Sequence, residues 1–287
     1  MAIQNENIEN QNDAMKSRVY TAVILVAATL ASIYLSEYTF VLLFGGIAGL
    51  CLWELLGLVL PNEKKRDLSR RVMGLLLGLT PYIAMGLIQL GFAPLRLRAE
   101  WVLLFFPFVF LAFIFELFAR SDRPFQNVAY VILGVIYIGV PFSMLEMVAF
   151  QDGRYEPNIV LGLMVLNWVN DTAAYLVGSR QGKTPLLPRI SPKKTWEGSM
   201  GGAIFTLLTC MGLAVLMPQR CCVDWAVLAV IIIIFGTLGD LVESMLKRSV
   251  QTKDSGSLLP GHGGLLDRFD SFLFMLPFAT IYLLWVR

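Results

Sequence analysis

Charged residues are scarce in this sequence: they make up 15% of its 287 residues, whereas hydrophobic residues make up 56%. Soluble domains usually contain about a quarter charged residues, so a large soluble helical protein of this composition could not cover its surface with polar groups. The net charge is only +2, which provides no basic field for nucleic acid. The composition therefore predicts an integral membrane protein that does not bind nucleic acid.

Several common site signatures are also absent or rare. The chain has one histidine and four cysteines without the spacing of a metal site, and the glycine–lysine pattern of a P-loop is missing. Its first fifteen residues, MAIQNENIENQNDAM, are too polar and acidic for a signal or transit peptide. Since no internal repeat or low-complexity linker is visible, we predict a short polar tail over residues 1–18 and one membrane-embedded catalytic domain over 19–287.

Long apolar runs dominate the rest of the chain, and such runs are typical of membrane-spanning helices. We predict an all-α, polytopic integral membrane protein with about nine transmembrane helices, the first two forming a tight hairpin. Gly45 and Gly49, and likewise Gly198 and Gly202, have the spacing that lets helices approach closely. The predicted spans are Val19–Tyr38, Phe40–Leu60, Val72–Phe92, Trp101–Ala119, Val128–Phe150, Asn158–Val177, Met200–Met217, Trp225–Leu246 and Leu265–Val286.

The distribution of basic residues predicts how these spans are oriented. Nine spans place 18 Lys and Arg residues on the side of the N-terminus and five on the other side. Basic residues are enriched in cytoplasmic loops, so we expect a cytoplasmic N-terminus and an external C-terminus. The charged segment between the last two spans, Leu241–Asp270, then lies in the cytoplasm.

Acidic and amide side chains recur at helical spacing at the ends of three predicted spans. They are Asn167, Asn170 and Asp171 in the sixth span, Asp240 and Glu243 with Ser244 and Lys247 in the eighth, and Asp267 and Asp270 with Ser271 in the ninth. Residues at i, i+3 and i+4 share one helix face, and ionisable groups in a membrane segment usually mark function. A solvated helix end paired with nearby bases would explain one such stripe. Three stripes near one boundary favour a shared divalent cation, with Mg²⁺ as the expected ion, and a polyphosphate substrate.

Two polar loops adjoin these stripes. The first, Gly178–Gly198, contains five bases together with Ser191, Thr195 and Glu197. Its lysines, hydroxyls and backbone N–H groups are suited to phosphate, although a loop that only sets topology would also be basic. The second, KDSGSLLPGHGG (Lys253–Gly264), is too rich in glycine for a helix. Its His262 is either a capping or packing residue or a group that donates hydrogen bonds or transfers protons.

The stretch from Ser244 to Asp270, SMLKRSVQTKDSGSLLPGHGGLLDRFD, closely resembles the signature of the phosphatidate cytidylyltransferases, also called CDP-diglyceride synthases. Three more segments resemble marked segments of that family: NDTAAYLVG at 170–178, SPKKTWEG at 191–198 and GTLGDLVESMLKR at 236–248. The resemblance is detailed over the signature region 167–271, whereas the N-terminal half resembles the family only in hydropathy and span count.

The resemblance implies an enzyme of phospholipid biosynthesis that converts CTP and phosphatidate to CDP-diacylglycerol and pyrophosphate. It further implies a divalent-metal requirement, a site at the cytoplasmic face of a bacterial inner membrane, and a homodimer. Metal candidates are Asp240, Asp267 and Asp171. We predict catalytic roles for Lys247, Lys253, Asp254, His262 and Asp270, and substrate binding by Ser191, Lys193, Lys194, Thr195, Glu197, Arg248, Gly263, Gly264 and Arg268.

Three other functions are compatible with parts of this pattern. A CTP-dependent kinase of an isoprenoid alcohol would attack the γ-phosphorus and release CDP, but the complete signature argues against it. A cytidylyltransferase for an unsaturated ether lipid is a closer relative. An ion-coupled transporter would place its polar residues near the midplane and contain inverted repeats, whereas here the polar groups gather at one boundary.

Overall fold

The computed structural model describes residues 20–60, 65–92, 100–119, 121–151, 153–256 and 263–286, which are mostly helical. The predicted tail over residues 1–18 lies outside this part. The first half contains an N-terminal helix (Tyr20–Leu35), α2 (Glu37–Val59), α3 (Lys65–Gln89), α4 (Glu100–Ala119), α5 (Pro124–Gly134), the π-helical turn η1 (Val135–Gly139) and α6 (Val140–Ala149). The second half contains α7 (Pro157–Gln181), α8 (Trp196–Leu216), α9 (Cys222–Ile231), the π-helical turn η2 (Ile232–Gly236), α10 (Thr237–Ser249) and α11 (Leu266–Trp285).

Helices lie over all nine predicted segments, because α5, η1 and α6 form one continuous helical segment, as do α9, η2 and α10. Within the described residues, six helical segments are long and apolar enough to cross a membrane: those beginning at residues 37, 67, 124, 157, 196 and 222. The N-terminal helix and Pro107–Ala119 are apolar but shorter, and α11 is not among the six. The prediction of a helical membrane protein is thus confirmed, whereas a total of nine spans stays a prediction.

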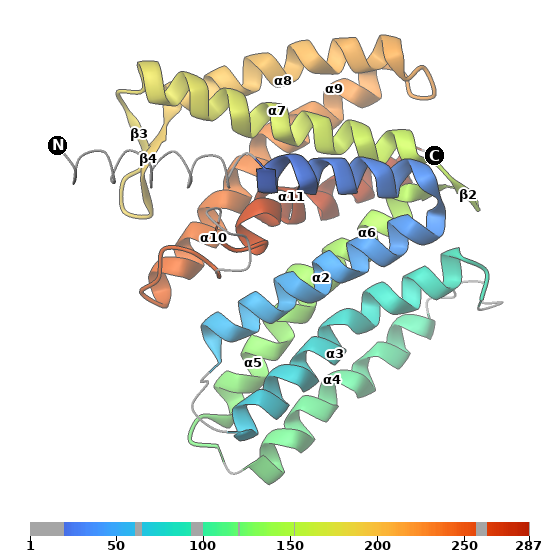
Figure 1. The fold of residues 1–287 in the computed structure, drawn as a ribbon, viewed down its shortest axis with the longest axis vertical. Helices are drawn as coiled ribbons and strands as arrows, with labels where there is room; N and C mark the ends of the chain where they lie inside the picture. Colours follow the sequence, from blue (N-terminus) through green and yellow to red (C-terminus); the bar gives the residue numbers. More distant parts are fainter. Residues whose placement is uncertain are drawn as a thin grey trace, which may run out of the picture.

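Two short antiparallel hairpins depart from the all-helical prediction. Phe150–Gln151 (β1) pairs with Arg154–Tyr155 (β2), and Pro185–Leu187 (β3) pairs with Ser191–Thr195 (β4). The second hairpin lies in the proline-rich loop between α7 and α8, where proline prevents helix. Figure 1 shows it at the same end of the molecule as α10.

The predicted hairpin of the first two helices is present, with Ser36 as the only residue between them. The Ser36 side chain accepts a hydrogen bond from the backbone N–H of Thr39 at 3.2 Å, and the Thr39 hydroxyl accepts one from the backbone N–H of Ser36 at 3.0 Å. This capping box satisfies two of the N–H groups that the start of α2 would leave unpaired. The N-terminal helix is therefore joined to α2 by a short and well-defined turn.

α11 lies between two groups of helices, with α7, α8 and α9 on one side and α2 to α6 on the other (Figure 1). Close approach is needed where it crosses α10, because a Cβ atom added at Gly239 would lie 2.9 Å from the Asp270 carbonyl oxygen. A similar crossing joins α7 and α8, where a Cβ at Gly198 would lie 2.8 Å from the carbonyl oxygen of Ala174. The predicted close packing at Gly198 and Gly202 is confirmed: it joins α8 to α7, while Gly239 joins α10 to α11.

Large apolar side chains also cover much of the outer surface. Leu42 on α2 and Leu117 on α4 are each 75% exposed, and Val215 on α8 is 80% exposed. Soluble proteins rarely expose extended apolar surface of this kind. These faces are suited to lipid, and the polar groups collect inside the helix assembly instead.

Candidate functional site

The three acidic stripes line one cavity of about 670 Å³, which we call the acidic cavity. Its aspartates come from α7, α10, α11 and the loop before α11. The lining residues are Thr21, Ala22, Leu25, Val26, Thr29, Trp168, Asp171, Thr172, Asp240, Lys247, Asp254, Asp267, Arg268, Phe269, Asp270 and Ser271. Helices α7, α10 and α11 therefore all contribute acids to one space.

Lys247 holds the signature segment together inside this cavity. Its ammonium group donates to a carboxylate oxygen of Glu243 at 2.6 Å and to one of Asp267 at 2.7 Å. Glu243 is fully buried, with a second oxygen that has no partner in the described part of the chain. A buried pair of this kind stabilises a site when hydrogen bonds accompany the charge, so Lys247 sets the position of Asp267 relative to α10.

A second cavity of about 610 Å³, the basic cavity, adjoins the first. The two cavities share Asp171 and Asp240, and the Lys194 ammonium forms an ion pair with Asp240 at their junction. The remaining walls carry lysines, small residues and hydroxyls: Asn170, Ala174, Tyr175, Gly178, Ser179, Gly182, Lys193, Thr195, Gly198, Ser199 and Thr237. Glycines and free donors along a basic wall are suited to a phosphate chain.

The start of α8 shapes the basic cavity. Thr195 is the N-cap, and its hydroxyl accepts from the backbone N–H of Gly198 at 3.2 Å. Glu197 accepts from the backbone N–H groups of Lys183 and Thr184 at 3.1 Å each. Glu197 therefore holds the segment between α7 and β3 against the start of α8, and it is not among the residues that line the cavity.

Asp267 and Glu54 together fix the described ends of the glycine-rich loop. Asp267 accepts from the backbone N–H groups of Gly264 at 2.9 Å and Ser255 at 3.1 Å. Glu54, on α2, accepts from the Leu266 N–H at 2.8 Å and from the Ser255 hydroxyl at 3.4 Å, and it is only 7% exposed. A Cβ at Gly264 would lie 2.7 Å from Glu54, so only glycine fits beside this carboxylate.

Glu54 is a functional candidate that the sequence did not single out. It appears there as one isolated acid in an apolar run, like Glu116 and Glu146. Glu116 instead forms a buried network with Arg70 and Asn127. None of these three residues lines either cavity. The only sequence signal for Glu54 is the cost of an acid in a membrane helix, and that cost does not reveal its partner.

The wall formed by the N-terminal helix was also missed. Thr21, Leu25 and Thr29 face the acidic cavity from a helix whose sequence carries no site motif. The helix is apolar, so it closes one side of the cavity with mostly hydrocarbon groups.

Several predicted residues do not line either cavity. Arg248 donates to the carbonyl oxygen of Thr252 at 3.3 Å, and Lys253 is exposed. Ser191 starts β4, and Gly263 lies beside Asp267 with a φ of +81°, which favours glycine. His262 lies outside the described residues, so its role stays a prediction. The remaining predicted residues line one cavity or the other, except for Glu197 and Gly264, which hold the surrounding loops.

Among the described residues, no three His, Cys, Asp or Glu side chains come close enough together to hold one metal ion. Lys194 and Lys247 instead neutralise Asp240 and Asp267. The donor chemistry still fits Mg²⁺, which commonly takes one or two carboxylates and completes its shell with phosphate oxygens and water. A site of this kind needs fewer protein ligands than the three aspartates predicted from the sequence.

Comparison with known proteins identifies the family. The profile of the cytidylyltransferase family matches residues 16–286. A phosphatidate cytidylyltransferase from Bacillus subtilis (strain 168) is 34% identical over 274 residues, covering 94% of this chain and 97% of that protein. Proteins of the same name from Staphylococcus aureus (strain COL) and Staphylococcus saprophyticus are 39% and 37% identical over 178 and 179 residues.

The S. aureus match covers 61% of this chain and 66% of the relative, just under two thirds of its length. The B. subtilis match extends the similarity into the N-terminal half, where the sequence itself showed only a hydropathy pattern. The family profile likewise covers both the helices that carry the acids and α2, which carries Glu54. The chain therefore belongs to the cytidylyltransferase family.

Proposed function

We propose that the protein transfers the cytidylyl group of CTP to phosphatidate, giving CDP-diacylglycerol and pyrophosphate. The observation that carries this proposal is the pair of adjoining cavities that share Asp171 and Asp240. One offers lysines and glycines to a phosphate chain, and the other offers carboxylates beside an apolar wall. The names of the relatives and the family profile support the same reaction.

The reaction joins a phosphatidate oxygen to the α-phosphorus of CTP and breaks the bond between that phosphorus and the bridging oxygen to the β-phosphate. Pyrophosphate leaves with the electron pair of the broken bond. The attacking oxygen is already ionised, so alignment and charge neutralisation matter more than proton removal. Lys193, Lys194 and Thr195 are positioned to bind the nucleotide phosphates and to balance the charge that develops on the leaving group.

Magnesium is part of the proposal. Asp171, Asp240 and Asp267 supply the carboxylates from which one or two ligands would be drawn, with phosphate oxygens and water as the others. The bound ion would neutralise negative charge on the nucleotide phosphates. Lys247 keeps Asp267 in place through their 2.7 Å hydrogen bond, and Asp254 and Asp270 supply further negative charge to the same cavity.

Product identification tests the function directly. Purified protein given CTP and phosphatidate in detergent should form CDP-diacylglycerol and pyrophosphate in equal amounts when a divalent cation is present, and neither product after chelation. Chromatography of the lipid and an enzymatic pyrophosphate assay measure both. Release of CDP, or phosphorylation of an isoprenoid alcohol offered in place of phosphatidate, would identify a kinase instead.

We further propose that the chain lies in a bacterial inner membrane with its N-terminus and active site in the cytoplasm, its C-terminus outside, and two copies in a dimer. The bias of basic residues supports this orientation, and the resemblance to the family supports the dimer. A reporter fused to the C-terminus should give an external signal, and chemical crosslinking in membranes should yield a dimer. A cytoplasmic reporter signal would require an even number of spans.

A further inference from the structure

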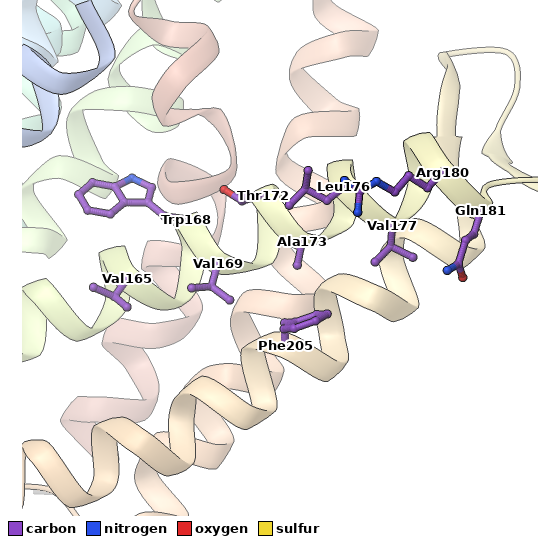
Figure 2. Close-up of a pocket in the computed structure, with 10 residues that line it drawn as sticks. All are labelled: Val165, Trp168, Val169, Thr172, Ala173, Leu176, Val177, Arg180, Gln181 and Phe205. Carbon is purple, nitrogen blue, oxygen red and sulfur yellow. The ribbon is translucent and has the colours of Figure 1, made fainter. Parts of the chain in front are cut away.

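A third cavity lies along α7, next to the acidic cavity. This α7 groove has a volume of about 510 Å³ and is lined by Val165, Trp168, Val169, Thr172, Ala173, Leu176, Val177, Arg180, Gln181 and Phe205. Figure 2 shows its small apolar side chains on the side of α7 that faces Phe205 of α8. Leu176 is 45% exposed and Phe205 is 51% exposed, so the groove opens on the outer surface.

The groove is continuous with the proposed active site, because Trp168 and Thr172 line both the groove and the acidic cavity. Asp171, which is adjacent to Thr172 in the sequence, lines the acidic and basic cavities. A path therefore leads around α7 from an apolar surface, past one hydroxyl, to the carboxylates and then to the lysines. The surface changes character along this path from hydrocarbon to polar.

The dimensions and charge of the groove fit one class of ligand. Its apolar part, Val165–Val177, is about 18 Å long at the rise of an α-helix, close to the roughly 15 Å of one leaflet of hydrocarbon. Arg180 is exposed at one end, with Gln181 beside it, and it forms no ion pair with the described residues. Figure 2 shows its guanidinium pointing back along α7 toward Leu176. This end is suited to a phosphate monoester, which carries roughly −1.5 to −2 charge at neutral pH.

We infer that the α7 groove is the entrance and acyl-chain site for phosphatidate. Arg180 binds the lipid phosphate as it arrives, and an acyl chain lies against Val165, Val169 and Phe205. The phosphate then passes Thr172 to reach the acidic cavity while the chain stays in the groove. This inference rests on the proposed function for its substrate, but the groove and its lipid can be tested without turnover.

A bulky side chain in the groove should discriminate between lipids by chain length. Val169→Trp is expected to raise the KM for dioleoyl phosphatidate about tenfold, since displacing even two methylenes from apolar contact costs that much. The KM for dihexanoyl phosphatidate and for CTP should stay within twofold of wild type. Leu208→Trp is the matched control, because Leu208 lies on α8, is 58% exposed and does not line the groove.

The positive charge of Arg180, at the end of the groove, should lower the KM for long-chain and short-chain phosphatidate alike. Arg180→Gln is expected to raise the KM about tenfold for dioleoyl and dihexanoyl phosphatidate alike, because a charge-assisted hydrogen bond to phosphate is lost. Arg154→Gln, on exposed β2, is the matched control and should behave as wild type. Equal KM values for Val169→Trp and wild type with dioleoyl phosphatidate would overturn the inference.

A second measurement does not depend on catalysis or on the folding of a variant. Phosphatidate with a photoreactive diazirine on its acyl chain should crosslink, in detergent micelles, to wild-type peptides that contain Val165–Val177 or Phe205. Mass spectrometry locates the crosslinks, and crosslinks confined to other helices would overturn the inference. If wild-type protein forms these crosslinks but makes no CDP-diacylglycerol, the proposed reaction fails while the lipid groove stands.

Discussion

Asp267→Asn is expected to lower kcat by about 10³-fold, comparable to the loss of one strong electrostatic group from an active site. The carboxylate of Asp267 accepts from Lys247, Gly264 and Ser255 at once. An asparagine has the same shape, but its NH₂ group would face donors, and the charge that balances the Lys247 ammonium would be gone. Radiolabelled CTP incorporation into lipid, with protein amount normalised by immunoblot of the membrane fraction, measures the effect.

Two comparisons separate this effect from a general loss of folding. Asp122→Asn, at an exposed position before α5, should keep wild-type activity. Asp240→Asn should be as inactive as Asp267→Asn, because Asp240 lies where the two cavities meet and pairs with Lys194. An Asp267→Asn enzyme with near-normal kcat would remove Asp267 from the site, and with it the reason to expect a cation there.

Glu54→Ala is the second substitution with a large expected effect, although Glu54 lies outside the signature. Its removal leaves the buried Leu266 N–H at the start of α11 without an acceptor, at a cost of about 1–3 kcal/mol. The loop residue Ser255, next to Asp254, and the first turn of α11, which carries Asp267, then both lose the acceptor that ties them to α2. We expect kcat to fall by about 10- to 100-fold, with the KM for CTP nearly unchanged, in steady-state assays on the monodisperse fraction.

Conservative replacement distinguishes positioning from bulk stability. Glu54→Gln keeps a carbonyl oxygen for the Leu266 N–H, so it should recover most of the activity lost in Glu54→Ala. Glu37→Ala, at the partly exposed start of the same helix, should lower kcat little. If Glu54→Gln is as inactive as Glu54→Ala, or if both are fully active, Glu54 does not act by holding this loop.

Much of the helical fold could be predicted from the sequence, because apolar runs long enough to span a bilayer are visible without tertiary information. The alignment of the acids within each helix followed from the i, i+3 and i+4 spacing, and the structure brings Asp171, Asp240 and Asp267 to one cavity. The pairing of two of these aspartates with lysines, rather than with one shared ion, could not be predicted. Lys194 and Lys247 lie between or beside the carboxylates, and which base pairs with which acid depends on packing between helices.

The contribution of the N-terminal half could not be predicted either. Glu54 is 212 residues away from its partner Leu266, and nothing in a single sequence connects two such positions. The β3–β4 hairpin had a local signal, its prolines, that excludes helix but does not specify strand pairing. The signature region therefore predicts the class of reaction. The contacts that Glu54 and the β3–β4 hairpin make with the site could be seen only in the three-dimensional structure.

The hydrocarbon wall of the acidic cavity has a practical consequence for work on this protein. Residues 20–35 look dispensable in the sequence, since they carry no motif and precede every marked segment. In the fold, however, Leu25 and its neighbours form one wall of the cavity that contains the aspartates. A shortened form that begins at α2 would open these charges to detergent or lipid, so N-terminal trimming for crystallisation should stop before Tyr20.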